Sequence, residues 1–210
     1  FWHGKEDDLV KSLDELLRIY DASVGSNAVL LLNVPPDRRG LVHERDAGRL
    51  AEFGEAIRTM FRENLAAGAR VTATSRRSGA GNGPELAIDG DPETFWTTED
   101  WREEADLVFR FPAARSLDTA VLQEHIRSGQ RIESFAVEVG DGPGWTGVAR
   151  GTTVGWKRIV RFPRRTTDRV RVRISASRVR PTLAEAGFFD SGRQEAPAAL
   201  PPEAGKDAAR

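Results

Sequence analysis

Between residues 70 and 190, hydrophobic residues recur at every second position in short runs, and this pattern most constrains the fold. Valine and isoleucine alternate with arginine over residues 169–174, and similar alternation occupies residues 107–111 and 135–139. Turn signals separate the runs, such as Asp-Gly at 89–90 and Asp-Gly-Pro-Gly at 141–144. Short alternating strands at this spacing predict an all-β antiparallel sandwich of the jelly-roll type.

Residues 1–66 have a different pattern, which predicts helix, strand and helix. Ser12 and Glu15 fit a capping box, and leucines at helical spacing follow them up to Gly25. The run Asn-Ala-Val-Leu-Leu-Leu-Asn at 27–33 predicts a strand buried on both faces. A second amphipathic helix is expected from about residue 45 to 64. This order of elements is typical of the end of an α/β fold, and the segment is too short to form a closed sheet alone.

Composition excludes several classes of function. The 31 basic and 32 acidic residues leave a net charge of −1, which argues against a nucleic-acid partner. No apolar run approaches 18 residues, so no membrane span is expected. The absence of cysteine excludes disulfides and thiolate chemistry, and three histidines make a multi-histidine metal centre unexpected. Because the sequence begins Phe-Trp-His, we expect a fragment of a longer protein.

Several stretches resemble the glycoside hydrolase family of retaining α-L-fucosidases, in particular its branch acting on α-1,3/1,4-linked fucose. Residues 27–40 carry the most specific part of this resemblance, and each other stretch is weak alone. Those others are residues 1–3, 10–17, 23–25, 130–131, 153–158 and 180–181.

The resemblance implies that residues 1–66 are the last helix–strand–helix of a (β/α)8-like catalytic barrel. It implies a discoidin-like, galactose-binding-type sandwich over 67–190, and the proline- and alanine-rich residues 191–210 are expected to be a disordered tail. In such enzymes an aspartate nucleophile and a second carboxylic acid perform the chemistry. Both would precede Phe1, so no catalytic residue is assigned in this chain.

Four residues are candidates for substrate binding. Asn33 closes the expected strand, and barrel active sites lie at the carboxyl ends of strands, so it would reach the site rim. The alternative is an asparagine that caps a turn. The resemblance places Phe1 and Trp2 beside the pocket, where an aromatic face suits the methyl group of fucose. Core packing is the alternative for both rings, and a structural role is the alternative for His3.

A second candidate site is a calcium loop. The stretch Ala-Ile-Asp-Gly-Asp-Pro-Glu-Thr-Phe-Trp at 87–96 resembles the calcium loop of discoidin-like domains. Calcium takes six to eight oxygen ligands. The candidate ligands are Asp89, Asp91, Thr94, Glu185 and the carbonyl oxygen of Ala87. Such an ion would be structural, and the alternative is a plain Asp-Gly turn.

Four tryptophans and a polar cluster remain in the sandwich. Trp96 and Trp156 are expected in the core, whereas Trp101 and Trp145 are expected to be more exposed and are candidates for stacking on sugars. Gln123, Glu124, Gln130 and Arg131 form a polar cluster that could face the barrel instead of solvent.

Two functions from different classes follow. The first is the C-terminal portion of an exo-acting α-L-fucosidase that hydrolyses terminal α-linked fucose by a retaining mechanism. This portion would be inactive alone, and its partners would be fucosylated glycans. The second is a non-catalytic carbohydrate-binding module. Residues 27–40 favour the first, because a pure binding module would not carry the end of a barrel. An extracellular or periplasmic location is expected for the full-length protein.

Overall fold

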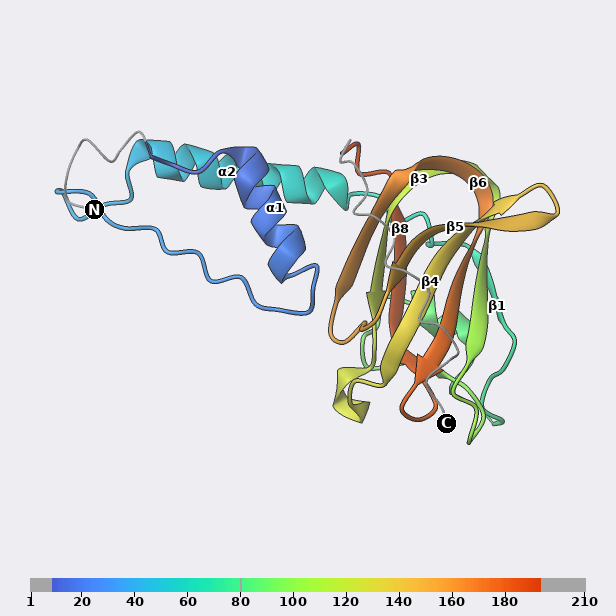
Figure 1. The fold of residues 1–210 in the computed structure, drawn as a ribbon. Helices are drawn as coiled ribbons and strands as arrows, with labels where there is room; N and C mark the ends of the chain where they lie inside the picture. Colours follow the sequence, from blue (N-terminus) through green and yellow to red (C-terminus); the bar gives the residue numbers. More distant parts are fainter. Residues whose placement is uncertain (1–8, 80, 194–210) are drawn as a thin grey trace, which may run out of the picture.

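A computed structural model describes residues 9–79 and 81–193, which form two helices followed by an all-β sandwich (Figure 1). The helices are α1 (Leu13–Ser23) and α2 (Glu44–Met60), and two 3-10 turns are η2 (Pro84–Ile88) and η3 (Ile126–Ser128). The strands are β1 (Arg70–Ala73), β2 (Trp96–Thr97), β3 (Ala105–Gln123), β4 (Ile132–Asp141), β5 (Gly144–Gly151), β6 (Arg158–Ser177), β7 (Thr182–Leu183) and β8 (Glu185–Phe189).

The sandwich is built on two long strands, β3 and β6, which pair antiparallel along most of their length. The first half of β3 also pairs with β1, and its second half pairs with β8. Register shifts between Arg110 and Arg115 and between Leu117 and Thr119 lie where the strands bend over (Figure 1). This bend turns one hydrogen-bonded sheet, in the order β1-β3-β6-β4-β5, into two facing layers.

The core lies between these layers and follows the alternation in the sequence. Leu107 and Phe109 of β3 and Val170, Val172 and Ile174 of β6 are buried. The ring of Phe109 meets that of Phe188 on β8 edge to face, with centroids 5.1 Å apart. The predicted antiparallel sandwich is therefore present, with the hydrophobic positions of each strand pointing inward.

The helices also form close to where the sequence predicts them. Ser12 accepts a hydrogen bond from the backbone N–H of Glu15, whose carboxylate accepts from the backbone of Ser12, so the capping box is present. The two helices pack through Tyr20 and Phe53, with ring centroids 6.2 Å apart. Among the described residues, no helix is both long and apolar enough to cross a bilayer.

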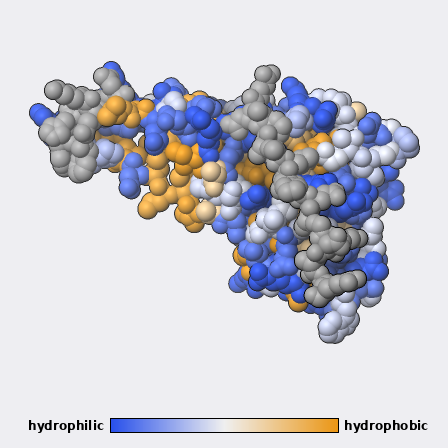
Figure 2. Space-filling model, viewed as in Figure 1, coloured by the Kyte–Doolittle hydropathy of each residue, from blue (hydrophilic) through white to orange (hydrophobic). Residues whose placement is uncertain are grey.

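Residues 27–33, which the sequence predicts as a buried strand, form no strand in this structure. The segment after Asn27 is extended but has no strand ladder, and Val29 and Leu31 are 91% and 85% exposed. Isolated β-bridges flank the segment, one from Ser26 to Arg158 and one from Pro36 to Val42. A strand needs a backbone partner, and the described part of the chain places none beside residues 28–35. Figure 2 shows the hydrophobic side chains gathered on the surface of this helical part.

Candidate functional site

The predicted calcium loop is a compact turn directly after η2. The backbone N–H of Asp91 donates to Oδ1 of Asp89 at 3.0 Å, and Thr94 Oγ1 donates to Oδ2 of Asp89 at 2.6 Å. Gly90 lies between the two aspartates with a φ of 83°, a left-handed conformation that glycine adopts without strain. Three of the five predicted ligands are thus brought together by one short stretch of sequence.

Glu185, the first residue of β8, joins this loop from far along the chain. Its Oε1 is buried and has no hydrogen-bond partner. Burial, followed by the negative charges of Asp89 and Asp91, raises the pKa of Glu185 to about 7. The structure therefore places an unsatisfied acidic oxygen beside two further carboxylates.

The side chains of Asp89, Asp91, Thr94 and Glu185 offer only oxygen ligands. Among residues 9–79 and 81–193, no three His, Cys, Asp or Glu side chains are spaced to hold a metal ion by themselves. Hydroxyl and backbone carbonyl oxygens would have to complete the ligand set. In the predicted set these are the hydroxyl of Thr94 and the carbonyl oxygen of Ala87. Calcium accepts such mixed oxygen sets at varied angles. A bound cation would also offset the repulsion between Glu185 and its acidic neighbours.

Asn33 lies in a different place, on a groove in the helical part of the molecule. The groove has a volume of about 330 Å³ and is lined by the segment before α1, residues 32–37 and the start of α2. Leu16, Leu32 and Leu50 line it together with Asn33, Asp37 and His43. Phe1, Trp2 and His3, the other predicted substrate-binding residues, lie outside the described residues.

The predicted polar cluster is organised by Glu124, whose side chain is 1% exposed. Its carboxylate accepts hydrogen bonds from the backbone N–H groups of Arg131, Ile132 and Gly155 at 2.7, 3.0 and 2.7 Å. Burial raises the pKa of Glu124 despite these donors. One buried carboxylate therefore joins the loop before β4 to the loop before β6.

The same loops contact the segment that follows α1. Oδ1 of Asn27 accepts a hydrogen bond from the backbone N–H of Trp156 at 2.7 Å, and its Nδ2 lies 3.4 Å from Oε1 of Gln130. A Cβ on Gly155 would come within 2.3 Å of the Asn27 amide, so only glycine fits there. Part of the polar cluster thus faces the helical segment.

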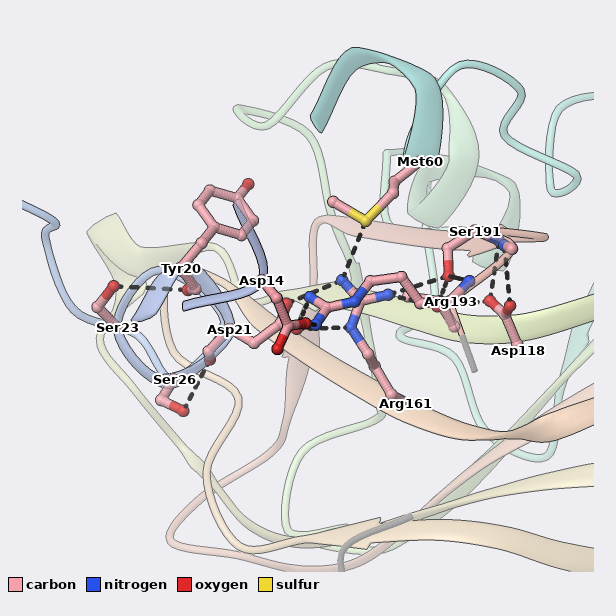
Figure 3. A network of polar contacts seen from close by, with 12 residues as sticks. Asp14, Tyr20, Asp21, Ser23, Ser26, Met60, Asp118, Arg161, Ser191 and Arg193 are labelled. Atoms are coloured by element: carbon pink, nitrogen blue, oxygen red, sulfur yellow. Dashed lines mark hydrogen bonds and ion pairs between the residues drawn. The ribbon is translucent and has the colours of Figure 1, made fainter. Parts of the chain in front are cut away.

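Sequence reasoning missed a second set of contacts across this junction (Figure 3). Both oxygens of Asp21 on α1 accept from the guanidinium of Arg161 on β6, each at 2.8 Å, and Arg193 donates to Asp21 at 3.0 Å. Ser191 in turn donates its backbone N–H to Asp118 at 2.9 Å. No local signal marks these pairs, because Asp21 and Arg161 are 140 positions apart.

The solvent exposure of the four tryptophans in the sandwich agrees in part with the prediction. Trp96 is fully buried and Trp101 is fully exposed, both as expected. Trp145 is half-buried beneath the guanidinium groups of Arg169 and Arg171, which lie 5.2 and 4.6 Å from its ring centroid. The prediction for Trp156 is wrong: its side chain is 52% exposed, because Glu124 and Asn27 hold its loop by the backbone at the surface.

Comparison with known families accounts for the sandwich. The family model described as F5/8 type C domain matches residues 70–185. The chain belongs to the F5/8 type C domain family. The match begins at β1 and ends at the predicted calcium ligand Glu185, so it covers nearly every strand of the sandwich.

Curated relatives extend the likeness beyond the F5/8 type C domain into the helical part. A protein named putative alpha-L-fucosidase 1 from Oryza sativa is 35% identical over 192 residues, and alpha-L-fucosidase 1 from Arabidopsis thaliana is 35% identical over 195. Each alignment covers 90% of this chain, which spans only 37% and 38% of the lengths of these two relatives.

Solved structures that resemble this chain are also fucosidases. A putative alpha-L-fucosidase from Bacteroides thetaiotaomicron matches with a TM-score of 0.85 and 37% identity, over 90% of this chain and 42% of that one. A GH29 fucosidase from Ruminococcus gnavus, solved in complex with fucose, matches with a TM-score of 0.80 and 34% identity over 85% of this chain and 37% of that one. The helices and the F5/8 type C domain therefore recur together in fucosidases.

Proposed function

We propose that this chain is the C-terminal portion of an α-L-fucosidase that hydrolyses terminal α-linked L-fucose from glycans by a retaining mechanism. One observation carries the proposal: the likeness to fucosidases covers 90% of the chain, including the helices as well as the F5/8 type C domain. A free-standing sugar-binding module would share only the sandwich.

In this proposal, residues 9–66 complete a (β/α)8-like barrel formed by the rest of the protein. Val29 and Leu31 support this, because two large hydrophobic side chains left in solvent need a neighbour to cover them. Adjacent barrel strands would bury them and would supply backbone partners for residues 27–33. Asn33 would then lie at the carboxyl end of its strand, where barrel active sites form.

The catalytic nucleophile and acid belong to barrel segments outside this chain, and the F5/8 type C domain supports the barrel. The contacts of Asp21, Asn27 and Asn64 with the sandwich favour such a rigid attachment. Asn64 lies in the segment between α2 and β1. Its Oδ1 accepts a hydrogen bond from the backbone N–H of Phe188 on β8 at 3.1 Å. An extracellular or periplasmic location, where glycans are encountered, accords with this function.

We further propose that the loop at 87–94 and Glu185 hold a structural calcium ion. The support is the buried, unpartnered Oε1 of Glu185 beside Asp89 and Asp91, with Thr94 hydrogen-bonded to Asp89. When bound, the ion would join the start of the sandwich to its last strand, and it would take no part in hydrolysis.

The activity is tested with the whole encoded protein and with this chain in parallel. The longer product should release nitrophenol from an aryl α-L-fucoside, and residues 1–210 alone should not exceed a heat-killed control. A longer product without turnover would refute the fucosidase proposal. Turnover by the chain alone, abolished by mutation of an acidic residue within it, would refute the placement of the catalytic carboxylates elsewhere.

A further inference from the structure

Asn27 and Asn33 mark the two ends of the segment that would be a barrel strand in the whole protein. Asn27 contacts the sandwich, through the backbone N–H of Trp156 and the side chain of Gln130. Asn33 instead lines the groove beside the start of α2. An extended chain rises about 3.3 Å per residue, so the two ends lie about 20 Å apart. The segment that follows α1 therefore runs away from the sandwich (Figure 1).

The direction of this segment orients the barrel relative to the sandwich. Active sites of (β/α)8 barrels lie at the carboxyl ends of the strands, whereas residues at the amino ends serve stability. The helices run the opposite way, so their carboxyl ends lie beside the amino ends of the strands. Asp21 near the end of α1 and Met60 at the end of α2 both contact Arg161 of β6, the latter at 3.7 Å. The sandwich thus lies at the amino ends, and the active site faces away from it.

Trp156 is the large hydrophobic side chain that the sandwich presents at this junction. Its side chain is 52% exposed, but the backbone of its loop is fixed. The N–H groups of Gly155 and Trp156 donate to the carboxylate of Glu124 and to Oδ1 of Asn27, each at 2.7 Å. A side chain on a fixed loop loses less conformational entropy when a partner covers it. The loop therefore holds Trp156 ready for a contact.

The hydrophobic surface of the helical segment indicates what covers Trp156. Val29 and Leu31, which follow Asn27 closely, are 91% and 85% exposed. Because Asn27 binds the backbone of Trp156, this exposed segment begins at the same contact. The chain spans only 37% and 38% of two fucosidase relatives, so the rest of such a protein is large enough to cover both surfaces. Tryptophan is also enriched among the residues that anchor protein interfaces.

We propose that the sandwich attaches to the amino-terminal end of the catalytic barrel, and that Trp156 packs against barrel segments outside this chain. The inference rests on the proposed function, because it takes the remaining part of the protein to be that barrel. It adds that the F5/8 type C domain contributes no side chain to the fucose site. Trp156 is then an anchor between domains, and its loss affects stability and leaves hydrolysis intact.

Hydroxyl-radical footprinting of residues 1–210 and of the whole encoded protein tests the contact. Trp156 should be oxidised in the shorter chain and severalfold more slowly in the longer one, where the barrel covers it. Trp101 is the matched control, because it is 99% exposed on the sandwich and should be oxidised equally in both. Equal oxidation of Trp156 in the two proteins would overturn the proposal. Protection that appears in residues 1–210 on dimerisation would also overturn it, since a second copy would then cover Trp156.

Variants of the longer protein test the orientation. Trp156→Ala should lower its Tm by several degrees and leave kcat and KM for an aryl α-L-fucoside unchanged. The same change should lower the Tm of residues 1–210 less, because the barrel contact is already absent there, and Trp101→Ala should lower neither Tm.

Two results with these variants would overturn the proposal. One is an unchanged Tm of the longer Trp156→Ala protein, and the other is a raised KM in that folded variant, which would place the sandwich at the active site. Footprinting needs no turnover. An inactive longer protein would therefore refute the fucosidase proposal, while the oxidation of Trp156 would still decide the contact.

Discussion

Asp21 on α1 and Arg161 on β6 form a two-point ion pair, with both nitrogen–oxygen distances at 2.8 Å. Their side chains are largely shielded from solvent, and Arg193 donates a further hydrogen bond to Asp21. Such paired contacts are stronger than single ones and fix orientation as well as distance. The pair therefore attaches the helical part to the sandwich in one arrangement.

Asp21→Asn should loosen this attachment. The amide cannot accept from two guanidinium groups with both atoms, so we expect docking of α1 to lose about 2 kcal/mol. Hydrogen exchange of the α1 amides should accelerate while that of β6 stays unchanged. Arg18→Gln is the control on the same helix, because Arg18 is exposed and forms its ion pair with Asp14, not with the sandwich. Equal protection of α1 in both variants would contradict the role of the pair.

Calcium should stabilise the sandwich. Binding to the folded state alone contributes about 2.7 kcal/mol when free calcium is a hundredfold above Kd, so melts with calcium and with EDTA should differ by several degrees. Asp89→Asn should remove the difference. Asp141→Asn should keep it, since Asp141 also precedes a glycine and accepts from a threonine hydroxyl, Thr146, at 3.1 Å but lies in another turn. Identical wild-type melts, without calcium by elemental analysis, would exclude the site.

Glu185 makes the stability of the calcium-free protein depend on pH. Its pKa is raised from 4.5 to about 7 in the folded state, so the folded protein holds this proton more tightly than the unfolded chain. The contribution is fully present below about pH 4.5 and is lost as pH rises through about 7. In EDTA, Glu185→Gln should flatten the fall in Tm over this window, whereas the exposed control Glu133→Gln should not. An unchanged profile for Glu185→Gln would contradict the raised pKa.

Glu124→Ala should be among the most destabilising single changes in the sandwich. Three N–H groups, two of them in buried hydrogen bonds, would lose their acceptor, and we expect a loss of about 3 kcal/mol in the free energy of unfolding. Glu133→Ala removes an exposed glutamate and should cost less than about 0.5 kcal/mol. Urea denaturation measures both. A small effect at Glu124 would mean that water readily replaces its carboxylate.

Trp101→Gly should stabilise the protein. Glycine adopts the left-handed conformation freely, so the substitution should relieve about 1 kcal/mol of backbone strain. Trp101→Ala is the matched comparison, because it removes the same ring but keeps a Cβ at a φ of 69°. Only the glycine variant should gain in Tm. A gain shared by both variants would show that the exposed ring, and not the backbone, carries the cost.

The sequence by itself determined the local elements. The alternation at 107–111 and 169–174 predicted strands with one buried face, and Ser12 with Glu15 predicted the start of α1. These signals are readable because each reports how one residue relates to neighbours two to four positions away. The aspartates and Thr94 of the proposed calcium loop are close in space for the same reason.

Only the tertiary structure decided which distant residues meet. Asp21 finds Arg161 140 positions away, and Asn27 finds the backbone of Trp156 129 positions away. The contact with Asn27 holds Trp156 at the surface, although its sequence context predicts that it lies in the core. Residues 27–33 are a second case in which the sequence alone does not decide the structure. Their hydrophobic run predicts a buried strand, yet burial and a hydrogen-bonded ladder require neighbouring strands, which the described residues do not supply.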